Sequence, residues 1–256
     1  RFLKHVFVRK ISLEKTVLKK MNHYSIDNGV MLSQLKIFLS EPYSKLIQKD
    51  TVSTRTMSSD QSRAILDGSR EEKRTLTAAQ SRVFDPIVNE GIKVGSSKPF
   101  LLWGVTGAGK TEIYMQSIQA LFDKSPEAQA LVLVPEISLT PQMTHVFERR
   151  FPGIVSVVHS ALSDNERWEK LEKVRTGEAR ILIGPRSAVF APFSKLRLIF
   201  VDEEHDSSYK QTTGLTYNGR DVAIVRAKLE GATIILGSAT PSMESFNNAT
   251  MGRYIY

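Results

Sequence analysis

The sequence predicts an α/β fold in which a parallel sheet, built around a phosphate-binding loop, carries helices on both faces. From Leu76 onward, short continuous apolar runs alternate with amphipathic stretches, a pattern typical of parallel strands buried on both faces. Residues 104–111 (GVTGAGKT) fit the pattern G-x-x-x-x-G-K-[ST]. Residues 202–205 (DEEH) directly follow an apolar run. Both segments fall at the carboxyl ends of expected strands, where such sheets bind ligands.

Each element of this fold is expected from local patterns. The expected strands are the apolar runs 100–103, 130–134, 155–158, 181–183, 198–201 and 234–236. Amphipathic helices are expected between them at 112–122, 141–150 and 164–175. The last of these begins with a capping box from Ser163 to Glu166 and stops at Gly177. If the segment 238–241 is a simple strand-to-helix turn, Pro241 would stand at the first position of the helix that follows.

Composition limits the classes of protein that remain. The 256 residues suffice for one large α/β domain and a small one, and 41% hydrophobic with 24% charged residues is ordinary for a soluble protein. No apolar run is long enough to span a membrane, and no signal peptide opens the chain, so a cytoplasmic location without a membrane partner is expected. The sequence contains no cysteine, which excludes disulfides and thiolate metal sites within it.

Positive charge is concentrated near the amino terminus. Residues 1–75 carry 15 Lys/Arg and 8 Asp/Glu, a balance of +7, which leaves +1 of the total +8 for residues 76–256. A basic module of this kind favours a nucleic-acid partner, and a solvated basic helix at 15–20 is the alternative.

The amino-terminal quarter is predicted to form a separate module. Residues 1–56 have small amphipathic helical patterns followed by a short β-branched piece at 51–54, which suits a winged-helix DNA-binding region; a plain helical adaptor is the alternative. Residues 57–74 are polar and are expected to be a linker. Residues 75–256 then form the α/β domain.

The two motifs together predict hydrolysis of a nucleoside triphosphate. Glycines let the loop wrap so that backbone N–H groups point at the phosphates. Lys110 is expected to contact the β- and γ-phosphates and Thr111 to ligate Mg²⁺. Asp202 is expected to hold the same metal, and Glu203 to polarise the attacking water. The residues expected to bind the nucleotide in this loop are Gly104, Val105, Thr106, Gly107, Ala108, Gly109, Lys110 and Thr111.

A third segment, Ser238-Ala-Thr-Pro241, follows the expected strand 234–236. Its hydroxyl groups are expected to hydrogen-bond the DEEH carboxylates and to sense the γ-phosphate. We therefore assign His205, Ser238 and Thr240 to coupling between the nucleotide and the rest of the protein. A simple strand-to-helix turn is the alternative.

With these motifs in place, the chain resembles the superfamily-two DNA helicases, and among them the bacterial primosomal replication-restart helicases. The resemblance covers about residues 76–256. The matching segments are GVTGAGKTE (104–112), LVPEISLTPQ (133–142), HSALSDNER (159–167), IGPRSAVFAPF (183–193), DEEHDSSYKQ (202–211), YNGRDVA (217–223) and LGSATPSMES (236–245).

The resemblance implies roles for individual residues. ATP and Mg²⁺ become the expected cofactors, with Glu203 as the catalytic base beside Asp202 and Lys110. Gln80 resembles the glutamine that recognises adenine, and its amide can donate to N7 and accept from the 6-amino group. An exposed helix residue is the alternative for Gln80.

DNA contacts are expected in four places. Arg186 and Ser187 would meet the phosphates of a single strand, as would the segment 135–142. The family commonly has Thr before this Arg-Ser pair, whereas this chain has Pro185. His159 is a candidate for an additional DNA contact, and a structural histidine at a strand end is the alternative. The loop 206–220 would stack bases and hold phosphates and would couple DNA to hydrolysis; its alternative is a surface loop in which Tyr209 covers the core. The loop residues assigned to DNA are Tyr209, Lys210, Tyr217 and Arg220.

The resemblance also implies a larger protein and a task. The chain is expected to be a fragment that contains the winged-helix region and the first motor lobe, without the second lobe, its arginine finger or the zinc-binding cysteines of the family. Weak ATPase activity is therefore expected from the fragment. The expected task is 3′-to-5′ DNA translocation that remodels stalled replication forks and initiates primosome assembly. The expected partners are single-stranded DNA, forks, single-strand-binding protein and primosome proteins, with the protein a nucleoid-associated monomer.

Two other functions remain open at this point. One is a different superfamily-two motor, such as a fork-regression helicase or a restriction-enzyme translocase, although DSSYKQ after DEEH argues against both. The other is a nucleotide-gated DNA-binding or loading adaptor.

Overall fold

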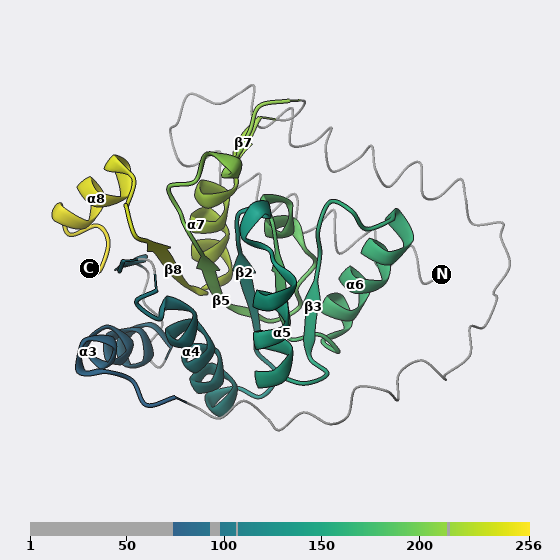
Figure 1. Ribbon diagram of the computed structural model, residues 1–256, viewed down its shortest axis with the longest axis horizontal. Helices are drawn as coiled ribbons and strands as arrows, with labels where there is room; N and C mark the ends of the chain where they lie inside the picture. Colours follow the sequence, from purple (N-terminus) through teal and green to yellow (C-terminus); the bar gives the residue numbers. More distant parts are fainter. Residues whose placement is uncertain (1–73, 93–97, 106, 214–215) are drawn as a thin grey trace, which may run out of the picture. The chain divides into compact units, whose positions relative to one another are not determined.

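A computed structural model describes residues 74–92, 98–105, 107–213 and 216–256. In this part of the chain a six-stranded sheet has the order β1-β8-β5-β2-β4-β3, and every neighbouring pair is parallel. Four of these strands, β8, β5, β2 and β3, are labelled in Figure 1. The α/β prediction is therefore confirmed, and the observed strands differ from the expected ends by at most two residues. The strands are β1 (Phe100–Trp103), β2 (Gln129–Leu133), β3 (Val155–Val157), β4 (Ile181–Gly184), β5 (Leu196–Val201) and β8 (Thr233–Ser238).

Helices connect these strands. The expected helices are confirmed, and the first of them begins directly at the phosphate-loop lysine. The helices are α3 (Ala78–Pro86) with a π-helical continuation (Ile87–Ile92), α4 (Lys110–Lys124), α5 (Pro141–Arg150), α6 (Asp164–Thr176), α7 (Gly219–Glu230) and α8 (Met243–Thr250). Short 3₁₀ turns lie at Glu136–Ser138, Arg186–Phe190 and Ser207–Tyr209. None of the helices described here is long and apolar enough to cross a membrane.

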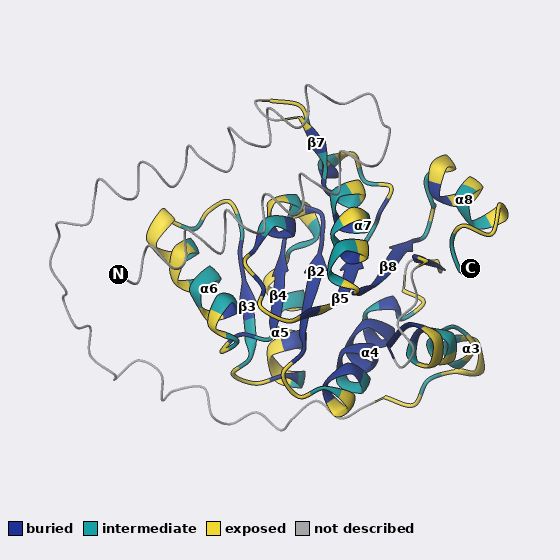
Figure 2. Ribbon diagram, turned by 180° about the vertical axis from the view of Figure 1, so that it is seen from behind, coloured by how far each residue is buried: buried dark blue, intermediate teal, exposed yellow. Residues whose placement is uncertain are grey.

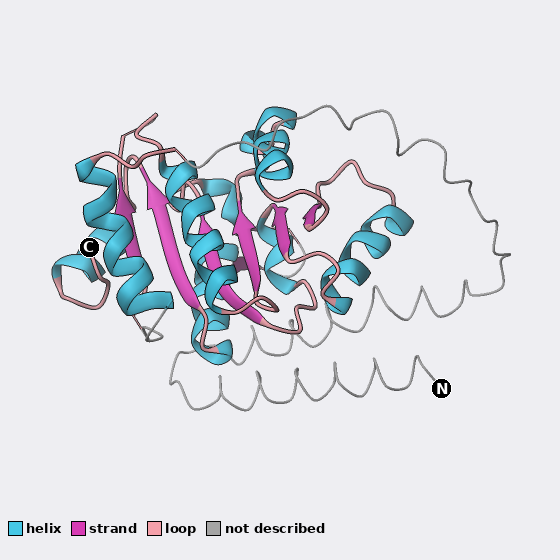
Figure 3. Ribbon diagram, turned by 90° about the horizontal axis from the view of Figure 1, so that it is seen from below, coloured by secondary structure: helices cyan, strands magenta, loops and turns pink. Residues whose placement is uncertain are grey.

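The sheet is buried on both faces, as continuous apolar strands require (Figure 2). Alternate residues of β5 enter different cores: Leu198 and Phe200 pack with α4 and α5, whereas Ile199 and Val201 pack with α6 and α7. Helices accordingly lie on both sides of the strands (Figure 3). This arrangement is the RecA-like α/β fold, and it leaves the strand ends as the place where polar loops can gather.

Helix ends follow the expected caps in one case and not in another. The capping box of α6 is confirmed: the Ser163 hydroxyl accepts from the Glu166 amide, and the Glu166 carboxylate accepts from the Ser163 amide at 2.9 Å. Gly177 ends this helix with a φ of 85°. Pro241, in contrast, is not at the first position of a helix. Helix α8 begins at Met243 because Ser242 is its N-cap.

The segment 206–220 is only partly a loop. After a 3₁₀ turn it forms a two-stranded sheet of β6 (Lys210–Gln211) and β7 (Tyr217–Asn218). Asn218 then caps α7 by accepting a hydrogen bond from the Arg220 amide at 3.0 Å. Gly219 and Arg220 therefore belong to a helix, contrary to the expectation.

The predicted winged-helix region and all of the predicted linker except Arg74 lie outside the described residues. The domain boundaries near residues 56 and 74 stay predictions.

Candidate nucleotide-binding site

Three motifs meet at the carboxyl ends of β1, β8 and β5. Strand β8 lies between the other two, so the loops that follow these strands are neighbours. Backbone hydrogen bonds join them: the Gly104 amide donates to the Ser238 carbonyl, and the Glu204 amide donates to the Gly237 carbonyl, both at 3.0 Å. The sheet order therefore brings together segments that are far apart in the sequence.

The glycine-rich loop has the conformation that its sequence predicts. Gly107 and Gly109 both have a φ of 82°, a value that other residues rarely adopt. Helix α4 begins directly after the loop, so its unpaired amides and its dipole favour an anion there. A Cβ atom at Gly109 would lie 2.4 Å from the Gln80 Nε2 atom, so a side chain there would displace the end of Gln80. Thr106 lies outside the described residues.

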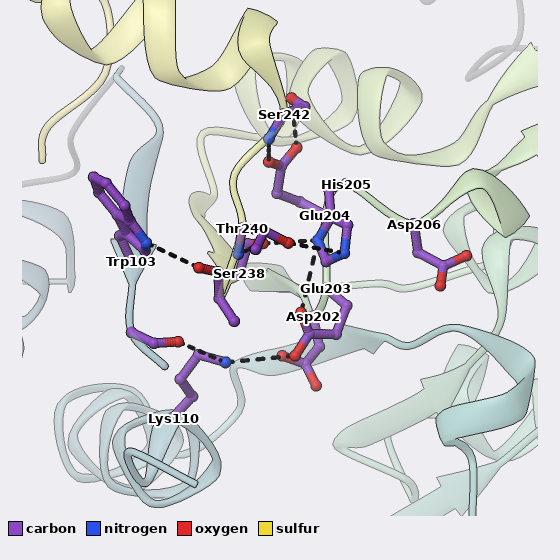
Figure 4. Close-up of polar contacts among 12 residues, drawn as sticks. Trp103, Lys110, Asp202, Glu203, Glu204, His205, Asp206, Ser238, Thr240 and Ser242 are labelled. Carbon is purple, nitrogen blue, oxygen red and sulfur yellow. Dashed lines mark hydrogen bonds and ion pairs between the residues drawn. The ribbon is translucent and has the colours of Figure 1, made fainter. Parts of the chain in front are cut away.

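Lys110 connects this loop with the acidic motif (Figure 4). Its Nζ donates to the Gly104 carbonyl at 3.0 Å and lies 3.4 Å from Glu203 Oε1. Glu203 has a φ of 44°, and among the described residues no other non-glycine residue has a positive φ. Such backbone strain persists where surrounding contacts impose it, and it is often found at functional sites. Thr111 follows as the second residue of α4.

Asp202 is held by two phenol groups. Its Oδ1 accepts a hydrogen bond from the Tyr114 hydroxyl at 2.9 Å, and its backbone carbonyl accepts one from the Tyr209 hydroxyl at 2.6 Å. Burial raises the pKa of the Asp202 carboxyl, an effect that the Tyr114 hydrogen bond partly opposes. Burial also raises the pKa of Tyr114 well above its ordinary value, so its phenol stays a neutral donor.

The coupling residues lie close together, but their contacts differ from the expected ones. His205 Nδ1 lies 2.7 Å from Ser238 Oγ, and His205 Nε2 lies 3.3 Å from Thr240 Oγ1 (Figure 4). These hydroxyls were expected to reach the carboxylates and instead contact the imidazole. The imidazole in turn lies 3.7 Å from Glu203 Oε2, through Nδ1. Ser238 therefore reaches Glu203 through the histidine.

The hydroxyls that do reach a carboxylate belong to Ser242 and Ser245, at the start of α8. Glu204 has a fully buried side chain. Its carboxylate accepts from the Ser242 amide at 2.7 Å, the Ser242 hydroxyl at 3.1 Å and the Ser245 hydroxyl at 2.9 Å. It also accepts from Arg220 Nη1 at 3.0 Å. Sequence reasoning missed this group. The run of hydroxyl residues in SATPSMES was the signal that could have indicated a buried acceptor.

Gln80 lies against the phosphate loop. Its Oε1 accepts from the Thr77 amide at 2.9 Å, and its Nε2 donates to the Ala108 carbonyl at 2.8 Å. The first contact belongs to the capping box of α3. Each amide atom has capacity for one more hydrogen bond, so Gln80 could contact a base without losing these partners.

The residues assigned to DNA are mostly engaged within the protein. Arg186 donates to the carbonyls of Ser208 at 2.7 Å and Lys210 at 3.0 Å, and so joins the turn after β4 to the segment after DEEH. Ser187 is exposed, and His159 is half-buried. The His159 carbonyl accepts from Arg167 at 3.3 Å.

In the segment after DEEH, too, most of the residues assigned to DNA are engaged within the protein. The side chain of Tyr209 is buried and that of Arg220 is nearly so, and both form the internal hydrogen bonds described above. Tyr217 is also buried, whereas Lys210 is exposed. For Tyr209 the geometry favours the alternative in which it covers the core. Contact of these residues with DNA stays a prediction.

Fold and motifs together define a RecA-like nucleotide-binding lobe of the helicase class. The model of the DEAD/DEAH box helicase family matches residues 77–249, and the chain therefore belongs to this family. Use of ATP and Mg²⁺ is general in such helicases.

Within the helicases, the curated relatives of this chain are replication restart proteins. Replication restart protein PriA of Bacillus subtilis (strain 168) is 43% identical over 83% of this chain and 28% of that protein. PriA of Haemophilus influenzae is 45% identical over 72% of this chain and 24% of that protein. PriA of Synechocystis is 52% identical over 57% of this chain and 18% of that protein. The chain thus spans less than a third of the length of these relatives. The resemblance to replication-restart helicases is confirmed.

A solved structure, RecG bound to a three-way DNA junction, matches 70% of this chain and 23% of that chain. The TM-score is 0.48 and the sequence identity is 23%, so this likeness adds nothing to the family assignment.

Proposed function

We propose that this chain binds ATP with Mg²⁺ at the carboxyl ends of β1, β8 and β5, and that it is the nucleotide-binding lobe of an ATP-dependent DNA helicase acting in replication restart. The observation that carries the proposal is the position of Lys110. Its ammonium group lies between the Gly104 carbonyl and the Glu203 carboxylate, so one cation faces both the phosphate loop and the acidic motif.

The residues present fit a magnesium–triphosphate complex. Loop amides and Lys110 would hold the phosphates, and Thr111 and Asp202 would supply oxygen ligands to the metal. Bound Mg²⁺ would neutralise charge on the phosphate oxygens. No group of three or more His, Asp or Glu side chains suited to a metal lies within the described ranges, so most other ligands would come from phosphate and water.

Glu203 would orient the attacking water. Its carboxylate lies beside Lys110 and within 3.7 Å of His205, so both neighbours can fix its direction. Through His205, the position of Glu203 would depend on Ser238 and Thr240, which supports their assignment to coupling.

Gln80 would recognise adenine. Its contact with the Ala108 carbonyl places the amide beside the phosphate loop, and the remaining donor and acceptor capacity matches N7 and the 6-amino group of adenine.

The task of the whole protein is inferred from its relatives, which are named replication restart proteins. On this basis the protein would be a nucleoid-associated bacterial motor that translocates 3′ to 5′ on DNA, binds forks and single strands, and works with single-strand-binding protein and primosome proteins as a monomer. Zinc would be bound outside this sequence, since the sequence has no cysteine. Arg186, Ser187, His159 and Lys210 are the DNA contacts that we favour within the described residues.

Calorimetry of ATP binding to this chain, with and without MgCl₂, tests the proposal. Lys110→Ala should abolish measurable ATP binding because it removes the cation between the loop and the acids. Lys173→Ala is the matched control, since Lys173 lies on the surface of α6 and pairs with Glu178. Wild-type affinity in the Lys110 variant would refute the assignment.

Turnover needs a separate test, which also distinguishes an enzyme from a nucleotide-gated adaptor. In the full-length protein, Glu203→Gln should keep ATP binding and remove hydrolysis, measured as phosphate release with single-stranded DNA present. Near-normal hydrolysis in this variant would remove Glu203 from its proposed role.

A further inference from the structure

Tyr114 is a fully buried polar side chain that reaches the nucleotide site but belongs to none of its motifs. It lies on α4, and its ring packs against that of Phe200 on β5, with centroids 4.5 Å apart. Packing alone would be satisfied by phenylalanine. The hydroxyl therefore needs its own explanation, because a buried hydroxyl is costly unless it is hydrogen-bonded.

The hydroxyl has one partner of clear chemical interest. It donates to Asp202 Oδ1 at 2.9 Å across 88 residues of sequence. Tyr114 follows Lys110 by four residues, so both side chains lie on one face of α4. Lys110 reaches Glu203 from this face, and Tyr114 reaches Asp202. One helix face thus contacts both adjacent acids of the DEEH motif.

Strand β8, the neighbour of β5 in the sheet, leaves room for the contact between Tyr114 and Asp202. A Cβ atom added to Gly237 on β8 would lie 1.9 Å from the Tyr114 hydroxyl oxygen and 3.1 Å from Cζ. It would also lie 3.5 Å from Asp202 Oδ1. Gly237 is not among the glycines with a positive φ, so its requirement is space and not backbone conformation. The absence of a side chain at Gly237 is what lets the hydroxyl approach the carboxylate.

A neutral donor in this position would fix the direction of the carboxylate. A hydrogen bond to an ionised oxygen is stronger than one between neutral groups. It uses one of the lone-pair sites of the carboxylate, and others remain for a cation. Partners of this kind around a metal ligand commonly set ligand orientation and metal affinity.

We propose that Tyr114 is a positioning residue that holds the Asp202 carboxylate in the orientation that receives Mg²⁺, and that Gly237 provides the space for its hydroxyl. The proposal rests on the proposed function, because it requires Asp202 to ligand the metal of an ATP complex.

The test is the Mg²⁺ dependence of ATP binding, measured by calorimetry at a series of MgCl₂ concentrations and in EDTA. Tyr114→Phe should raise the Mg²⁺ concentration at half-maximal enhancement by about 10-fold, the scale seen when partners of metal ligands are removed. ATP affinity in EDTA should be unchanged, since the phosphate loop and Lys110 are intact. A merely structural tyrosine would not move the Mg²⁺ dependence alone.

Two further variants control this result. Tyr254→Phe removes a half-buried phenol hydroxyl that bonds Asn248, and it should leave the Mg²⁺ dependence at the wild-type value. Gly237→Ala should weaken Mg²⁺-dependent binding and lower the melting temperature, because its methyl group displaces the Tyr114 hydroxyl. The double variant Gly237→Ala/Tyr114→Phe should recover the melting temperature in part, since the closest clash is gone.

The outcomes separate this inference from the function on which it rests. If wild-type protein binds ATP with Mg²⁺ dependence and Tyr114→Phe has the same dependence, the positioning role is overturned while the proposed function stands. Normal stability and binding in Gly237→Ala would likewise overturn the inference. If wild-type protein shows no Mg²⁺-dependent binding of ATP, the proposed function fails.

Discussion

Arg220 Nη1 lies 3.0 Å from Glu204 Oε2, and this ion pair joins the start of α7 to the acidic motif. The Glu204 side chain is fully buried, and that of Arg220 is only 12% exposed. The same guanidinium nitrogen donates to the Ser242 hydroxyl at 2.8 Å, so the pair also fixes the cap of α8. The DEEH motif is thus divided: Asp202 and Glu203 face the phosphate loop, whereas Glu204 anchors two helices.

Arg220→Met should therefore destabilise the fold. It leaves the buried Glu204 carboxylate without its cation, and breaking a buried pair in this way typically costs about 3–5 kcal/mol. Chemical denaturation measures the loss. Asp221→Asn is the matched control, because Asp221 contacts the same guanidinium from an exposed position and should matter little.

The double variant Arg220→Met/Glu204→Gln should recover part of this loss, since no charge is then left unpaired. If Arg220→Met keeps wild-type stability and only weakens DNA binding, Arg220 is the DNA contact that the sequence resemblance implied.

Removing the charge of Asp202 and removing that of Asp206 should change the stability of the fold in opposite directions. Because burial raises the pKa of Asp202, its ionised form costs stability, and that cost is present in full above the raised pKa. Asp202→Asn should therefore raise the melting temperature at neutral pH in the absence of nucleotide, while Oδ1 of the new amide still accepts from Tyr114. The same variant should lose Mg²⁺-dependent ATP binding.

Asp206 provides the control for this prediction. Hydrogen bonds from the backbone and side chain of Ser208 lower its pKa, so its ionised form stabilises the fold at neutral pH and this stabilisation is lost as pH falls through the lowered pKa. Asp206→Asn should lower the melting temperature at neutral pH. Equal shifts of the same sign in both variants would contradict the assignment of opposite pKa directions.

Tyr209 and Lys210 are neighbours that should affect different properties. Tyr209→Ala removes a buried aromatic side chain and should cost about 3 kcal/mol or more of stability. Tyr209→Phe loses only the hydrogen bond to the Asp202 carbonyl and should cost about 1 kcal/mol.

Lys210→Ala should leave stability unchanged and weaken single-stranded DNA binding, most strongly at low salt, because its side chain is exposed. Denaturation and fluorescence anisotropy with labelled oligonucleotide measure the two effects. Wild-type stability in Tyr209→Ala, together with lost DNA affinity, would return Tyr209 to the role of a base-stacking residue.

The sheet and its motifs were predictable because their signals are local. Runs such as Leu198 to Val201 are short and continuously apolar, which favours a strand buried on both faces, and the parallel order places the motifs that follow them at one edge. The capping box at Ser163 is likewise contained in four residues. These features depend on backbone preference and apolar periodicity, which a single sequence carries.

The partners of buried polar residues were not predictable. Tyr114 in an amphipathic helix has the pattern of a core residue, and nothing near it indicates Asp202, which is 88 residues away. Arg220 beside two tyrosines has the composition of a nucleic-acid loop, and only the fold brings it to Glu204. Pro241 was misplaced because Ser242, a better N-cap, follows it directly.

Gln80 links the capping box of α3 to the phosphate loop, and its substitution by glutamate tests whether it also reads the base. Gln80→Glu keeps the acceptor for the Thr77 amide but removes both N–H donors, so the contact with the Ala108 carbonyl and the proposed bond to adenine N7 are lost together. ATP affinity should fall by about 10-fold, and the preference for ATP over GTP should shrink, because one neutral hydrogen bond contributes about 1 kcal/mol and a carboxylate facing a carbonyl adds repulsion. Calorimetry with ATP and GTP measures both quantities.

Thr77→Val is the control for this prediction, because it loses the hydroxyl acceptor of the capping box but keeps the Gln80 amide. It should lower stability without changing the ratio of the ATP and GTP affinities. An unchanged preference in Gln80→Glu alongside weaker binding of both nucleotides would show that Gln80 supports the loop and does not read the base.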